Sequence, residues 1–120
     1  MRGSAMDVDA EIRNAIEVGE RQGLASLAGM RQQVFAISEA EVYCDKDGID
    51  ALVHRYGFST MHIFAEAYRA IGAADIASAL LELHAAGTPS RKLMSRANTL
   101  ITRREGYSYE NLETLVRRST

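Results

Sequence analysis

The stretch of residues 59–87 constrains the fold of this chain more than any other. Its apolar residues recur at intervals of three and four, a spacing that places them on one face of an α-helix. The two stripes are Met61, Phe64, Tyr68 and Ile71, followed by Ile76, Leu80, Leu81 and Leu83. Gly72 separates them and Gly87 follows the second; glycine readily adopts the positive φ with which many helices end. We therefore predict a central helix hairpin, with Asp75 capping its second helix.

Further short helices are predicted on both sides of this hairpin, each from a capping residue and a terminating glycine. We expect them over about 8–22, 27–43, 48–56, 89–105 and 109–118. The expected caps are Asp7 or Asp9, Ser26, Asp47, Thr88 and Ser108, and Pro89 would occupy a first helical position. No segment shows the alternation or β-branched enrichment of a strand. The sequence thus predicts an all-α, single compact domain of six or seven short helices.

Length and composition limit the class of protein. The chain has 120 residues, 47% of them hydrophobic, which suits one domain with its own core. Residues 1–6 resemble a vector-derived leader, so the predicted helical domain is 7–120. The single cysteine, Cys44, excludes an internal disulfide and fits a reducing compartment. With no run of eighteen apolar residues to span a membrane, we predict a cytoplasmic protein.

The charge is distributed unevenly along the chain. Residues 1–90 hold thirteen acids and seven Lys/Arg, a balance of −6, whereas residues 91–120 have a balance of +4. Two arrangements are open at this point. Either the two parts stay separate and the domain is polarised, or the basic segment packs on the acidic body and neutralises it.

A dense group of acids marks one region of the acidic part. Five carboxylates fall within twelve residues, opposed by Lys46 alone: Glu39, Glu41, Asp45, Asp47 and Asp50. Glu39 and Glu41 are expected in the last turn of a helix, where carboxylates oppose the macrodipole. Such a local conflict is a mild indication that acidity serves a purpose there. The cluster could engage a basic protein partner; the alternative is a solvated corner.

Other candidate sites are weaker. An EF-hand loop with Gly48 at its sixth position would place Tyr43 first and His54 twelfth, and neither supplies the required carboxylate. Asp50 and His54 lie one helical turn apart, but two ligands are too few for a transition-metal site. His62 and His84 are expected to be partly exposed helix histidines.

No nucleophile motif surrounds Cys44, which we expect to be a small buried thiol, and neither a serine elbow nor a phosphate loop is present. We therefore predict no catalytic residue, cofactor or metal. The basic residues are Arg91, Lys92, Arg96, Arg103 and Arg104. They could contact phosphates, but the acidic total charge and the lack of a helix-turn-helix pattern argue against direct nucleic-acid binding.

The segment EAEVYCDKDGIDALVHRYG followed by EAYRAIGAADIASALLELH carries a resemblance to a known family. Over about Leu24–Gly87 the chain resembles a bacterial family of small helical domains named for a neisserial DNA-mimic protein. The hairpin turn Ile71-Gly72-Ala73 matches, whereas Lys46-Asp47-Gly48 replaces the family's frequent Asn-Gly-Gly turn. The resemblance implies a helical fold and, by analogy with the named member, an acidic surface that engages a DNA-binding protein.

Our leading hypothesis is a non-enzymatic protein–protein interaction domain that uses the acidic cluster to engage a basic partner. The alternatives are a small metal-assisted enzyme using Asp50 and His54, and a nucleic-acid binder through the basic helix 91–104. A homodimer is also predicted if Tyr107, Tyr109 and the apolar stripe of the first helix are exposed together.

Overall fold

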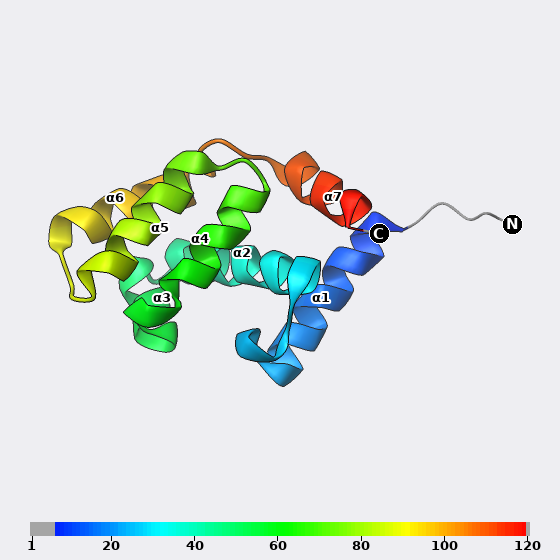
Figure 1. Cartoon of the computed structure of the whole chain (residues 1–120), viewed down its shortest axis with the longest axis horizontal. Coiled ribbons are helices and arrows are strands. Elements are labelled where there is room, and N and C mark those ends of the chain that lie inside the picture. Colours follow the sequence, from blue (N-terminus) through cyan, green and yellow to red (C-terminus); the bar gives the residue numbers. More distant parts are fainter. Residues whose placement is uncertain (1–6, 120) are drawn as a thin grey trace, which may run out of the picture.

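The computed structural model describes residues 7–119, so the expected leader over 1–6 lies outside the described part. Within it, the chain forms seven α-helices and two short 3₁₀ turns, with no strand, which confirms the all-α prediction (Figure 1). The helices are α1 (Val8–Gln22), α2 (Gly29–Lys46), α3 (Ile49–Tyr56), α4 (Met61–Ala70), α5 (Ala74–Ala86), α6 (Arg91–Thr102) and α7 (Tyr109–Arg118). The 3₁₀ turns cover Leu24–Ser26 and Phe58–Thr60. None of these helices is long and apolar enough to cross a membrane.

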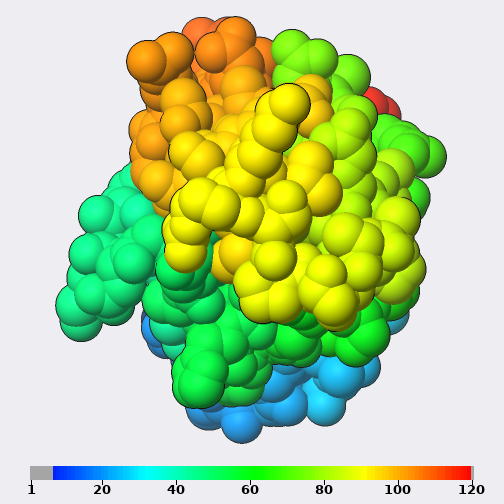
Figure 2. Space-filling model, turned by 90° about the vertical axis from the view of Figure 1, so that its left-hand side faces the viewer, coloured from blue at the N-terminus to red at the C-terminus, as the bar shows by residue number. Residues whose placement is uncertain are grey.

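The helices assemble around α2, which is the longest and contacts α1, α3, α4, α6 and α7. Helices α1 and α7 pack together at one end of an elongated molecule, and α3, α5 and α6 gather at the other (Figure 1). Figure 2 looks onto the second end, where α6 and its connections cover the face and the turn between α2 and α3 projects at its edge.

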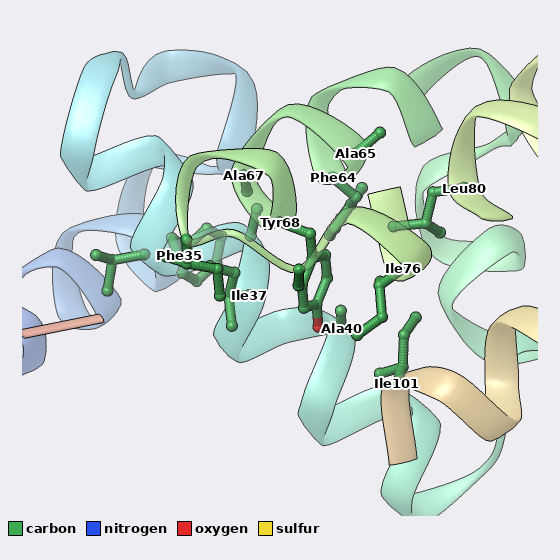
Figure 3. Packing of buried hydrophobic residues seen from close by; sticks show 14 of the residues in the cluster. Phe35, Ile37, Ala40, Phe64, Ala65, Ala67, Tyr68, Ile76, Leu80 and Ile101 are labelled. Atoms are coloured by element: carbon green, nitrogen blue, oxygen red, sulfur yellow. The ribbon is translucent and has the colours of Figure 1, made fainter. Parts of the chain in front are cut away.

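The central hairpin is formed as the sequence predicts. Helices α4 and α5 make the most extensive contact of any helix pair in residues 7–119. Phe64 and Tyr68 of α4 and Leu80 of α5 are completely buried in the core shown in Figure 3. Gly72 turns the chain between the helices with φ +83°. The prediction that Asp75 caps α5 is wrong, because the capping position is Ala73 and no side chain bonds there; Asp75 lies in the first helical turn instead.

Close packing of α1 on α2 depends on Gly19. A Cβ built on Gly19 would lie 2.3 Å from the Phe35 ring of α2, far inside van der Waals contact. The absence of a side chain at Gly19 thus lets the aromatic ring lie directly against the α1 backbone. Asp7 caps this helix by accepting from the Ala10 N–H at 3.0 Å, as predicted.

Two other predicted helix starts are wrong. Ser26 lies in a 3₁₀ turn and α2 begins at Gly29, because the Gln32 side-chain amide ties down the preceding segment by donating to the Leu24 and Leu27 carbonyls. Helix α6 begins at Arg91 rather than Pro89, with Ser90 in place of Thr88 as its cap.

Two large hydrophobic side chains are exposed. Val42 of α2 is 55% exposed, and Tyr109 at the start of α7 is 51% exposed. Val42 lies off the three-and-four spacing that Val34 and Ile37 follow, and both of those residues are buried. The Ser108 cap of α7 is confirmed: its N–H donates to the Asn111 side chain at 2.7 Å.

Candidate functional site

The acidic cluster lies at the end of α2 and the start of α3. Helix α2 continues to Lys46, beyond the predicted end at Tyr43, so Glu39 and Glu41 precede its last turn. The predicted conflict of these two glutamates with the helix dipole is therefore wrong; Asp45 is the carboxylate in the last turn. Gly48 follows the end of α2 with a φ of +89°, and its N–H donates to the Tyr43 carbonyl of the helix at 3.0 Å.

Asp47 was predicted to cap α3, and the structure corrects this assignment. Asp47 occupies the C-cap of α2, and Gly48 is the residue before α3. The Ile49 N–H at the start of α3 is instead satisfied from a distant helix, by the Asn98 side-chain oxygen of α6 at 2.9 Å. The Asp47 carboxylate is consequently not used by the helix start, and it is exposed.

The five carboxylates do not form one continuous surface. Asp45, Asp47 and Asp50 are exposed, whereas Glu39 and Glu41 are half-buried. Glu41 and Asp45 are one turn apart on α2 and share a face, while Glu39 is two residues from Glu41 and so faces the other side. We call Asp45, Asp47 and Asp50 the acidic edge.

Arg104 joins two of the carboxylates. Its Nη1 and Nη2 donate to the two Asp45 carboxylate oxygens at 2.9 and 2.7 Å, and its Nε lies 3.1 Å from a Glu41 oxygen. The same Glu41 oxygen accepts a hydrogen bond from the Tyr107 hydroxyl at 2.5 Å. The bonds from Arg104 hold the pKa of Asp45 below its ordinary value. Arg104 itself is half-buried between the two carboxylates.

Two further members of the basic segment also pair with the acidic body. Arg91 approaches Asp50 at 3.5 Å, and Arg96 bonds Glu82 at 2.7 Å. Of the two arrangements that the charge pattern left open, the structure has the basic segment packed on the acidic body. Lys92 and Arg103 are exposed and have no ion-pair partner within residues 7–119.

Glu39 belongs to a different part of the surface. It accepts a hydrogen bond from the Tyr56 hydroxyl and lines a groove with Glu20, Tyr43 and Arg55. Burial, together with this bond to Glu39, raises the pKa of Tyr56 well above its ordinary value. Glu39 thus joins α2 to α3 and is not brought together with the acidic edge.

The alternative metal site gains no third ligand. Asp50 and His54 line one shallow hollow, but Arg91 also lines it and pairs with Asp50. Among residues 7–119, no group of three or more His, Cys, Asp or Glu side chains is placed to hold a metal ion. Cys44 is buried as predicted, and burial raises the pKa of its thiol to about 12, so the reactive thiolate is suppressed at neutral pH.

The surface on which the homodimer prediction depended is only partly present. Ile12 and Ala15 of α1 are buried, and Tyr107 is half-buried with its ring against Tyr68. Tyr109 is exposed, and its hydroxyl donates to Asp9 at 2.7 Å. Within the predicted patch Tyr109 is therefore exposed, and Ile16 and Tyr107 are half-buried.

The structure brings together two histidines that we did not predict to be neighbours. His62 in the first turn of α4 and His84 in the last turn of α5 have ring centroids 5.1 Å apart. The sequence held a signal for this, because an antiparallel hairpin turning at Gly72 places the start of one helix beside the end of the other.

Comparisons with protein-family models, curated proteins and solved structures find no match to this chain. The resemblance to the DNA-mimic family therefore stays a prediction.

Proposed function

We propose that the chain is a non-enzymatic interaction domain that engages a basic partner protein through the acidic edge. The observation that carries the proposal is the placement of Asp47. It is exposed on the turn that projects between α2 and α3 (Figure 2), and it has no ion-pair partner among residues 7–119. An unpaired carboxylate on a projecting turn can meet a partner's cation without first breaking an internal bond.

The neighbouring acids differ in how available they are. The Asp50–Arg91 pair is long at 3.5 Å, and its side chains are 58% and 80% exposed, so a partner's arginine could displace Arg91 at little cost. Asp45 is held by two short bonds from Arg104 and is less free to exchange. We therefore place the contact on Asp47 and Asp50, with Asp45 at its border.

The internal pairing also limits the size of such a contact. Arg91, Arg104 and Lys46 offset much of the negative charge around the edge, so it lacks the extended, uncompensated charge of a nucleic-acid backbone. The proposal is accordingly a local acidic contact, and imitation of a long stretch of DNA is not part of it. Glu39 and Glu41, which accept tyrosine hydrogen bonds, are assigned to holding the fold.

The test is a comparison of two single charge reversals. Asp47→Lys alters the acidic edge, and Glu17→Lys makes the same change at an exposed mid-helix position of α1, at the other end of the molecule. Proteins captured from a bacterial lysate by the immobilised wild type at low salt are identified, and their retention by each variant is measured. We expect Asp47→Lys to lose basic partners that Glu17→Lys retains. Equal retention by the two variants would contradict the proposal.

A further inference from the structure

Two exposed imidazoles lie together at the end of the hairpin opposite its turn at Gly72. His62 and His84 are both exposed, their ring centroids are 5.1 Å apart, and their planes are inclined at 48°. The helices that carry them pack closely through a buried core, so the backbone positions from which the two side chains extend are held by rigid elements.

Both rings are oriented by the same 3₁₀ turn. His62 Nδ1 lies 2.7 Å from the Ser59 carbonyl oxygen, and His84 Nδ1 lies 3.2 Å from the Phe58 carbonyl oxygen. A carbonyl oxygen only accepts hydrogen bonds, so each Nδ1 must carry the proton. In the neutral ring, Nε2 then keeps its lone pair, and neither Nε2 has a hydrogen-bond partner among the described residues.

This arrangement is the one that metal-ligating histidines usually show, with one ring nitrogen bonded to a carbonyl and the other free for the metal. We propose that His62 and His84 form a two-histidine site for a divalent transition metal such as Zn²⁺, Ni²⁺ or Cu²⁺. Each Nε2 donates its lone pair. In residues 7–119 no third His, Cys, Asp or Glu joins the pair, so the site is a weak, open chelate whose remaining positions are filled by water or an external ligand. It differs from the rejected Asp50 and His54 pair because both of its ligands are histidines with a free Nε2, whereas the Asp50 carboxylate is paired with Arg91.

The spacing of the rings agrees with a shared metal. For a metal–nitrogen bond of about 2.1 Å and a ring centre about 1 Å behind the nitrogen, two imidazoles on a tetrahedral ion have centroids about 5 Å apart. The observed centroid separation of 5.1 Å matches this value. Imidazole suits Cu²⁺, Ni²⁺ and Zn²⁺. Since the affinity of a given nitrogen site for divalent first-row metals is highest for Cu²⁺, we expect Cu²⁺ to bind most tightly of the three.

The three histidines of the chain provide a matched test. Titration calorimetry with Zn²⁺ and Ni²⁺ is carried out on the full chain and on His62→Ala, His84→Ala and His54→Ala. Loss of either member of a chelating pair should lower the affinity by about tenfold or more. The His54→Ala variant should bind like the wild type, since His54 lies on α3 and outside the pair.

A second measurement reports the site directly. In a long-range ¹H–¹⁵N spectrum of the imidazoles, added Zn²⁺ should shift the Nε2 signals of His62 and His84 and leave those of His54 in place. Circular dichroism verifies that each variant is folded. Wild-type binding no tighter than that of the His62→Ala/His84→Ala double variant would overturn the proposal. So would an equal loss of affinity in His54→Ala.

Discussion

Replacing Arg104 separates two opposing contributions at the junction of the acidic body and the basic segment. Arg104 follows α6 and has φ +53°, the one positive φ at a non-glycine residue in the described chain. An L-residue in this region is strained, whereas glycine is not. Arg104→Ala should therefore remove the contacts to Asp45 and Glu41 and keep the backbone strain. Arg104→Gly should remove the contacts and the strain together.

The magnitude follows from the exposure of the partners. The pair with Asp45 is bidentate, but its side chains are 35% and 48% exposed, so it contributes about 0.5–1 kcal/mol. Glu41 is 26% exposed, and its charge-assisted contact adds about 1–1.5 kcal/mol. Arg104→Ala should thus lower the free energy of unfolding by about 2 kcal/mol. Arg104→Gly should lower it by about 1 kcal/mol, because relief of the strain returns about 1 kcal/mol.

The assay is urea denaturation at low salt, because urea does not screen ion pairs. The chain has no tryptophan, so unfolding is followed by far-ultraviolet circular dichroism. Arg103→Ala is the control, since Arg103 is exposed, has no ion pair within residues 7–119, and should change stability by less than about 0.5 kcal/mol. A glycine variant no more stable than the alanine variant would refute the strain argument. An alanine variant as stable as the control would refute the contribution of the ion pairs.

Three further predictions concern pH, burial and packing. Arg104 holds the pKa of Asp45 in the folded state below its ordinary value of 3.8, so their pair stabilises the fold while Asp45 is ionised. In urea titrations, the stability difference between wild type and Arg104→Ala should hold from about pH 7 to 5 and shrink below about pH 4. Tyr68→Phe removes a buried hydroxyl without a hydrogen-bond partner in residues 7–119, so it should leave stability unchanged or raise it by about 1–2 kcal/mol, and a loss above about 1 kcal/mol would contradict this. Gly19→Ala gains about 1 kcal/mol of helix propensity but overlaps the Phe35 ring, so we expect a net loss of about 1–2 kcal/mol, which a Phe35→Leu background should reduce in a double-mutant cycle.

The hairpin was predictable because its information is local. The stripes of α4 and α5 lie within single helices, and a glycine φ of +83° at the turn is a preference of the residue itself. The same holds for Asp7 and Ser108, which cap helices a few residues away.

The failures share the opposite property. The start of α3 is satisfied by Asn98, 49 residues away, and this distant partner leaves Asp47 without the capping role that its position suggests. Arg104 meets Asp45 across 59 residues, using a backbone conformation that its side chain does not favour. No periodicity or motif in the sequence marks either contact. The sequence therefore shows which residues are polar or charged, but not which of them pair.

This pairing changes what the acidic cluster can offer a partner. A count of carboxylates treats all five alike, whereas the fold assigns Glu39 and Glu41 to tyrosines and Asp45 to Arg104. The carboxylates that remain available for the proposed partner are Asp47 and the loosely paired Asp50. If a partner binds these two residues, its affinity should depend steeply on Asp47 and weakly on Glu39, whereas a uniform acidic surface would give similar losses at both positions.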